Sequence, residues 1–212
     1  MIRTQPATFR RFLIAALTIA AGGALFSCSD IPGPDDKSGT FFGPTSVLAG
    51  GSARAYVILD RTGAPGSPYT LPHFDVHAYM ITEAERKAMV LGDAQLAAKM
   101  VRQPAAEFIP AGYVPGPVIV EMGMHWTDPA APERNGQPFT HTFFYGSYDG
   151  AFVLNEPMVT KAFLETKPAA VVTPLKLPAQ YSVRGYQPTS YTVGYDAAAK
   201  EYRIALSGLV ER

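Results

Sequence analysis

The stretch LPHFDVHAYMITEAERK, residues 71–87, decides the local fold of this chain. In its first ten residues, apolar and polar side chains alternate, which is the period of a β-strand. Thr82 followed by Glu85 then has the spacing of a capping box, which predicts a helix beginning at Glu83. Because a helix that begins there leaves the preceding residues to another element, the sequence predicts a strand followed by a helix.

The polar face of this predicted strand carries His73, Asp75 and His77, and the whole chain has only four histidines. In a strand, alternate residues lie roughly 6.6 Å apart and residues four apart lie roughly 13 Å apart. Either histidine can therefore share a metal ion with Asp75, whereas the two histidines can share one only if the strand bends. In a helix they would stack one turn apart and could share a metal, but the alternation favours the strand.

Further metal-ligand candidates lie downstream, in the blocks EMGMHW, FTHTFF and NEPM. Imidazoles and carboxylates are the donors that zinc, copper, nickel or iron sites use when thiolates are absent. We therefore predict a site for a divalent transition metal. The predicted ligands are His73, Asp75, His77, His125 and Glu156, with His141 and Glu121 as further possibilities. Asp75 could instead orient a histidine by accepting its N–H group.

The alternative is a non-enzymatic structural or small-ligand-binding module, as a monomer or a homo-oligomer, in which the histidines are only hydrogen-bonded into the fold. The 11 tyrosines suit a ligand or partner surface as well as ordinary strand packing. No reaction is predicted. GSYDG has Tyr148 rather than serine at its centre, so it is not a nucleophile elbow, and no glycine-rich phosphate loop lies at a strand–helix junction.

The N-terminus has the pattern of an export signal. Arginines precede the apolar run FLIAALTIAAGGALF, which is too short and wrongly flanked for a transmembrane span. The run ends in LFSC, which resembles the bacterial lipobox, where the cysteine is acylated and becomes the first mature residue. The alternative is an ordinary signal peptide with a coincidental cysteine. We predict a signal peptide over residues 1–27 and lipidation of Cys28.

Cys28 is the only cysteine, so once lipidated it leaves no thiol for catalysis, metal binding or a disulfide. Acyl chains on it would anchor the protein stably in a membrane. Ser29 favours the outer membrane, so we predict a cell-envelope protein facing the periplasm. The chain has 18 basic and 18 acidic residues. Loss of the three signal arginines would leave a slight acidic excess, which gives no electrostatic footprint for nucleic acid.

The rest of the chain predicts a single α+β domain over residues 51–212, joined to the anchor by a flexible tether over residues 28–50 that is rich in Pro, Gly and Ser. The expected elements are a mainly antiparallel sheet with one long and one short helix. The long helix is expected over residues 83–100 and the short one in EPMVTKAFLETK. Strands are expected over 53–60, 71–80 and 118–126, in a short segment of AAVVTPLKLP, and in hairpins around Asp149-Gly150 and DAAAK.

Four blocks resemble an uncharacterised family of exported bacterial domains of unknown function: PHFDVHAYMI, MGMHW, FTHTFFYGSYDG with EPMVT, and the tail YQPTSYTVGYDAAAKEYRIALSGL. The likeness covers residues 50–212, and its specific parts are the His-x-Asp-x-His stretch and the EPM block. Members of that family tend to have His-Phe-Tyr where this chain has His77, Ala78 and Tyr79, so the ligand-type side chains are kept while the apolar face differs. The resemblance implies an extracytoplasmic α+β domain and brings no established reaction.

Overall fold

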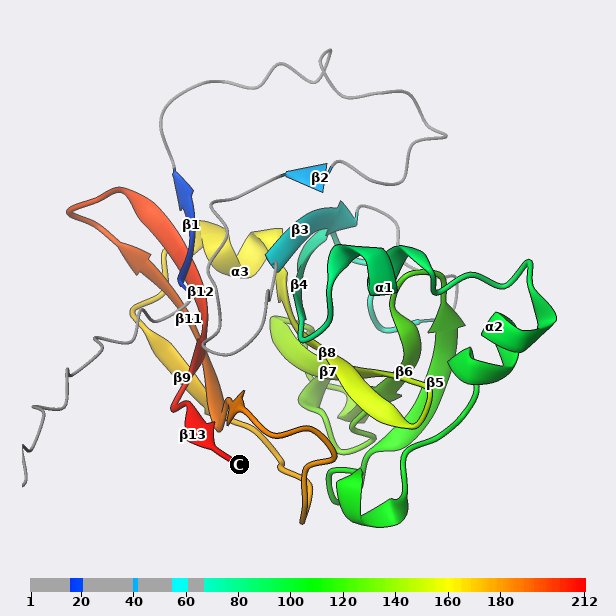
Figure 1. The fold of residues 1–212 in the computed structure, drawn as a ribbon. Helices are drawn as coiled ribbons and strands as arrows, with labels where there is room; N and C mark the ends of the chain where they lie inside the picture. The colour runs from blue at the N-terminus through cyan, green and yellow to red at the C-terminus, as the bar shows by residue number, and fades with distance from the viewer. Residues whose placement is uncertain (1–15, 21–39, 42–54, 61–66) are drawn as a thin grey trace, which may run out of the picture.

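The computed structural model describes residues 16–20, 40–41, 55–60 and 67–212, and its strands form antiparallel sheets with few helices between them (Figure 1). The described strands are β1 (Ala16–Ala20), β2 (Thr40–Phe41), β3 (Ala55–Asp60), β4 (His73–Tyr79), β5 (Val114–Ile119), β6 (Gly123–Thr127), β7 (His141–Tyr148), β8 (Ala151–Thr160), β9 (Val171–Pro174), β10 (Tyr186–Gln187), β11 (Ser190–Asp196), β12 (Glu201–Ser207) and β13 (Val210–Glu211). The described helices are α1 (Glu83–Lys87), α2 (Ala94–Met100), α3 (Lys161–Glu165) and the 3-10 turns Ala106–Phe108 and Pro132–Asn135.

Among the described residues, the largest sheet has seven strands in the order β2-β3-β4-β8-β7-β6-β5. A second sheet has the order β1-β12-β11-β9, and β10 pairs with β13. β7 and β8 are joined at Asp149 and Gly150, whose φ angles of 51° and 83° suit the type I′ hairpin turn predicted from that dipeptide. The predicted final hairpin is also confirmed, as β11 and β12.

The two faces of the seven-stranded sheet have different partners. On its inner face, side chains such as Val76, Phe143 and Tyr145 pack against Tyr191 and Ile204 of the second sheet, which makes the main core. The residues that alternate with these along the same strands face outward, because successive side chains of a strand point to opposite faces of the sheet.

The outer face is covered at two ends. At one end, Tyr79 and Leu154 pack with Met89 and Met100 from the region of α1 and α2. At the other end, a smaller cluster forms from Tyr69, Phe139, Phe144 and Met158. The stretch of β8 between Leu154 and Met158 lies between these two apolar clusters, and the candidate site is found there.

The predicted strand–helix order of the opening stretch is confirmed. β4 ends at Tyr79, and Thr82 and Glu85 form both hydrogen bonds of the capping box that begins α1.

The prediction of one long and one short helix is wrong, because three short α-helices are found among the described residues. The expected long helix over residues 83–100 divides into α1 and α2. Gly92 weakens the helix between them, and the Asp93 side chain accepts hydrogen bonds from the Gln95 and Leu96 amides, which caps a new helix. EPMVT belongs to β8, so α3 begins only at Lys161.

The predicted strand over residues 118–126 is instead a hairpin. β5 ends at Ile119 and β6 begins at Gly123, with Glu121 at φ 64° and Gly123 at φ 80° in the turn. The alternation of side chains that predicted a continuous strand therefore runs across a turn.

The predicted signal peptide and tether, including Cys28, lie outside the described residues except for β1 and β2. β1, within the predicted signal peptide, pairs with the edge of β12, with Ala16 opposite Ala205. Within the described part of the chain, no helix combines the length and the apolar character needed to cross a membrane.

Candidate metal centre

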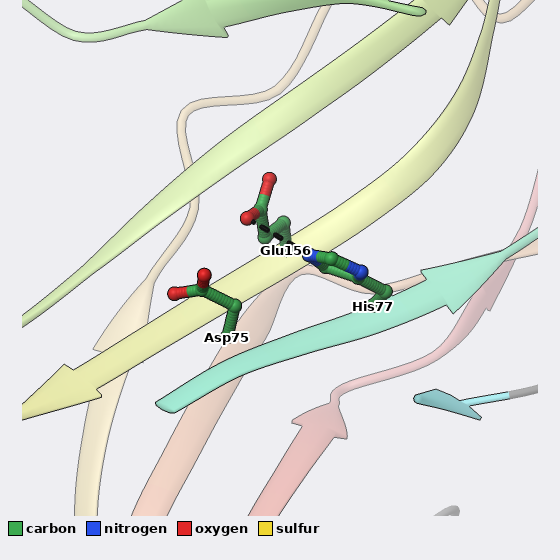
Figure 2. A group of neighbouring side chains, drawn as sticks. All are labelled: Asp75, His77 and Glu156. Carbon is green, nitrogen blue, oxygen red and sulfur yellow. Dashed lines mark hydrogen bonds and ion pairs between the residues drawn. The ribbon is translucent and has the colours of Figure 1, made fainter. Parts of the chain in front are cut away.

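Three strands bring the candidate ligands to the outer face of the large sheet. His73, Asp75 and His77 come from β4, and Glu156 comes from the adjacent β8. Figure 2 shows Asp75 and His77 on one strand beside Glu156 on the next, with their side chains on the same side of the sheet. His125 comes from β6, which is separated from β8 by β7.

Glu156 is the centre of the cluster, because each of its two carboxylate oxygens meets a histidine. His77 Nε2 lies 3.1 Å from Oε1, and His125 Nε2 lies 3.1 Å from Oε2. All three side chains are almost fully buried, with Glu156 only 3% exposed. An isolated carboxylate at such a depth would be strongly destabilising, so Glu156 requires a proton, a histidinium ion or a metal cation beside it.

His125 reaches Glu156 across the intervening strand β7. Gly146 is opposite His125 in the β6–β7 pairing, and Phe144 is opposite Glu156 in the β7–β8 pairing. His125 and Glu156 therefore face each other across β7 with an offset of two residues.

Pro157 interrupts the pairing of β4 with β8 beside the cluster. Asp75 pairs with Met158 and Ala78 pairs with Asn155, but no pairing is formed at the two positions between them. Proline has no backbone N–H to donate, and a fully buried proline in a central strand is unusual. The interruption lies where His77 and Glu156 face each other.

His73 and Asp75 extend the cluster along β4. His73 Nε2 lies 3.2 Å from Asp75 Oδ1, and its Nδ1 lies 2.7 Å from the carbonyl oxygen of Leu71. His73 is 1% exposed, and the Asp75 side chain is 13% exposed. Asp75 lies between His73 and His77 on β4. The cluster therefore forms without the strand bend that a metal shared directly by the two histidines would need.

The hydrogen bonds of two histidines fix which ring nitrogen carries a proton. A carbonyl oxygen can only accept, so Nδ1 of His73 donates to Leu71, and Nδ1 of His125 donates to the Pro117 carbonyl at 3.3 Å. In the neutral imidazole, each Nε2 is then an unprotonated lone pair. Each faces a carboxylate oxygen, Asp75 Oδ1 or Glu156 Oε2.

These two carboxylate oxygens, Asp75 Oδ1 and Glu156 Oε2, are buried and accept no hydrogen bond of normal geometry from the described residues. A nitrogen lone pair and a carboxylate oxygen about 3 Å apart repel each other unless a proton or a cation lies near both. A backbone carbonyl that holds Nδ1–H and leaves Nε2 free is the usual outer-shell arrangement of a metal-binding histidine.

The spacing of the donor atoms is close to that of a coordination sphere. Ligand atoms of Asp75, His77 and Glu156 all lie within 4.8 Å of one another. Zinc-ligand bonds of about 2.0–2.2 Å put donors of a tetrahedral site roughly 3.3 Å apart and limit any pair to roughly 4.4 Å. The histidine–carboxylate pairs already meet this spacing, and small side-chain movements would complete it.

The pKa shifts follow from burial and from these close charges. Burial favours protonated Glu156, but the histidines His77 and His125 outweigh it and hold the pKa of Glu156 far below its usual value. Burial opposes protonation of His125, yet Glu156 raises the pKa of His125 above its usual value. For Asp75, burial is the largest cause and raises the pKa, against the effect of His73. Glu156 is therefore the carboxylate of the cluster that stays ionised, beside the two imidazoles.

Two predicted candidates lie elsewhere. His141 Nδ1 is 2.7 Å from the Tyr191 hydroxyl, and the His141 ring packs against Phe163 and Tyr191 toward the second sheet. Glu121 forms an ion pair with Arg86 in the β5–β6 turn. The structure brings together the other five candidates: His73, Asp75, His77, His125 and Glu156.

Sequence reasoning missed the groups that support the cluster. The carbonyl groups of Leu71 and Pro117 carry no signal in the sequence, because any residue supplies one. Pro157 could have been found, since a proline inside a strand-like run indicates interrupted pairing.

Comparisons with models of protein families, with curated proteins and with solved structures found no match.

Proposed function

We propose that this protein is a lipid-anchored domain of the cell envelope that binds a divalent transition metal through His77, His125 and Glu156. Asp75 is the fourth donor, and His73 lies beside it, with its Nε2 3.2 Å from Asp75 Oδ1. Two imidazoles with two carboxylates suit zinc or ferrous iron, with copper and nickel as further possibilities.

The observation that carries this proposal is the arrangement of His125. Its Nδ1 is held by the Pro117 carbonyl while its Nε2 faces a buried Glu156 oxygen that accepts no hydrogen bond from the described residues. A cation between these two atoms removes their repulsion and satisfies both.

Burial of the ligands favours a closed site that braces β4, β6 and β8. Catalytic zinc sites keep an open position for water or substrate, whereas structural sites are enclosed by protein ligands. His73, His77, His125 and Glu156 are each at most 5% exposed. When bound, the metal would supply a cross-link between strands distant in sequence, and this proposal assigns no reaction to it.

Elemental analysis tests the metal site. The chain is produced without a histidine tag, supplied with each metal in turn and freed of loosely bound ions. We expect close to one equivalent bound, with Glu156→Gln and His125→Ala each losing it. His141→Gln is the matched control, because it changes a half-buried histidine outside the cluster and should keep the metal.

The alternative is a metal-free ion-pair cluster in which Glu156 lies between partly protonated histidines. Bound metal below about a tenth of an equivalent after supplementation with all four metals would contradict the metal proposal. Metal retained equally by Glu156→Gln and the parent chain would also contradict it.

The anchor is a separate proposal that rests on the LFSC motif alone. Metabolic labelling with a radioactive fatty acid should mark the chain, and Cys28→Ser should abolish the label. A label that persists in this variant would place the modification elsewhere.

A further inference from the structure

A second polar site lies on the inner face of β8, one residue away from the metal cluster. Asn155 precedes Glu156 and points to the opposite face, where it is opposite Ala78 and Tyr145 in the paired strands. Asn155 lines a pocket together with Phe108, Phe152, Gln180, Tyr181 and Gln187. Part of this lining comes from the segment between β9 and β10.

Two residues that line this pocket each have a donor without a hydrogen-bond partner among the described residues. These donors are the side-chain amide nitrogen of Asn155 and the hydroxyl of Tyr181, both of them buried atoms. Asn155 is only 2% exposed. Leaving a buried donor unsatisfied costs about 1–3 kcal/mol, so two such groups at one pocket point to an acceptor that binds there.

The pocket sets the size of that acceptor. The volume open to the centre of a water-sized molecule is about 20 Å³, which accommodates one or two waters or a single small polar group. Aromatic rings of Phe108, Tyr145 and Phe152 form much of the wall. A charged group would be expensive to bury there, whereas a neutral carbonyl oxygen can accept from both donors.

The mouth of the pocket has a different character. A wider and more open hollow of about 440 Å³ shares Pro178, Gln180 and Tyr181 with the pocket and is also lined by Arg184 and Arg212. Hydrogen bonds between the backbones of Gly185 and Arg212 hold the two arginine-bearing segments together. Two guanidinium groups at a solvent-exposed mouth favour an anion.

We propose that this pocket and its mouth bind a small organic anion that carries a neutral carbonyl group, such as an N-acylated amino acid. The carbonyl oxygen accepts hydrogen bonds from Asn155 and Tyr181, and the carboxylate lies beside Arg184 and Arg212. This site lies on the other face of the sheet from the metal cluster, so it does not depend on the proposed metal.

Titration of the ¹⁵N-labelled full-length chain tests the proposal through the side-chain amide signal of Asn155, identified by its loss in Asn155→Asp. The probes are N-acetylglycine, which has both groups, acetamide, which has only the carbonyl, and acetate, which has only the carboxylate. We expect N-acetylglycine to shift the signal with the lowest dissociation constant, acetamide to shift it more weakly, and acetate to leave it unchanged.

Conservative variants separate binding from folding. Tyr181→Phe keeps the ring and should weaken N-acetylglycine binding about five-fold, the typical effect of one neutral hydrogen bond. Arg184→Gln should weaken N-acetylglycine but leave acetamide unaffected. Tyr195→Phe, a tyrosine outside the pocket, is the control and should bind as the parent chain does.

Two outcomes would overturn the proposal. If ordered water alone satisfies the pocket, the Asn155 signal will not respond to any probe at concentrations up to about 20 mM, above the millimolar range expected for such small ligands. If Tyr181→Phe and Arg184→Gln bind N-acetylglycine as tightly as Tyr195→Phe, the ligand binds elsewhere.

Discussion

His141 is a histidine whose role can be separated from the metal cluster. It begins β7, packs between Phe163 and Tyr191, and has its Nδ1 2.7 Å from the Tyr191 hydroxyl. Burial lowers the pKa of His141, and the charge of Glu133 opposes this only in part. The folded protein therefore favours the neutral imidazole more than the unfolded chain does.

This shift predicts a pH dependence of stability. A base whose pKa is lower in the folded state stabilises the fold above its unfolded pKa, about 6.5 for histidine. That contribution is lost as the pH falls through 6.5 toward the folded pKa, because the unfolded chain then binds more protons. We expect the free energy of unfolding to decrease more steeply between about pH 7 and 5.5 in the parent chain than in His141→Gln.

Urea unfolding of both chains across this pH range measures the difference directly. Comparison with the variant removes contributions of the other histidines, including that of His125, whose raised pKa has the opposite sign. Parallel pH profiles for the two chains would contradict the prediction.

Much of the cluster follows from residue type and strand period. Alternation places His73, Asp75 and His77 on one face, and the scarcity of histidines made His125 a natural partner. Alternation cannot show which strands become neighbours, because β4 pairs with β8 over about eighty residues of chain. Alternation also could not assign a face to His141, which is therefore only a further candidate in the sequence, because its face depends on a register that only the folded sheet fixes.

At the scale of the element, Gly146 allows β7 to pack closely against its neighbours. A Cβ at this position would lie 2.7 Å from the Met122 carbonyl oxygen and 2.9 Å from Leu154 Cβ. Since backbone atoms cannot yield as a flexible side chain does, Gly146→Ala should force β7 away from its neighbours. We expect a loss of about 1–3 kcal/mol in the free energy of unfolding, the usual cost of overpacking.

Gly92→Ala is the matched control for Gly146→Ala, because its added Cβ meets no described atom within 4 Å. Chemical denaturation of both variants measures the effect. Equal stability of Gly146→Ala and Gly92→Ala would show that β7 accommodates the methyl group without strain.

Asp93 caps the start of α2, at the point where the expected long helix divides. The Asp93 side chain accepts from the amides of Gln95 and Leu96, which would otherwise lack partners at the start of α2. Asp93→Ala should destabilise α2 by about 1 kcal/mol, whereas Asp93→Ser should retain most of the cap. Hydrogen exchange at these two amides measures the local effect, and unchanged exchange in Asp93→Ala would contradict it.

Local sequence signals predicted the presence of helices and strands better than they predicted the residues at which these elements begin and end. The capping box of Thr82 and the turn dipeptide Asp149-Gly150 act over a few residues, so both are visible in the sequence and both are confirmed. Gly92 is also a local signal for a break in the helix, but the helix-forming residues on both sides of it favoured a continuous helix in the prediction. By contrast, the turn at Glu121 required a non-glycine residue at positive φ, which residue preferences do not predict.

At the scale of the whole molecule, the cluster links strands that the chain connects only through long segments. A metal held by His77, His125 and Glu156 would join β4, β6 and β8 at one point. An ion that binds only the folded state stabilises it by an amount that grows with the logarithm of the free metal concentration, about 2.7 kcal/mol at one hundred times the dissociation constant.

Metal removal should therefore lower the melting temperature of the whole chain. For a protein of this size, about 2.7 kcal/mol corresponds to a decrease of roughly 5–10 °C, measured by differential scanning calorimetry with and without chelator. Re-addition of the metal should restore the transition, and Glu156→Gln should melt at one temperature under both conditions because it has lost the central ligand. A parent chain that melts identically with chelator and with metal would show that its buried histidines and carboxylates stabilise the fold through protons alone.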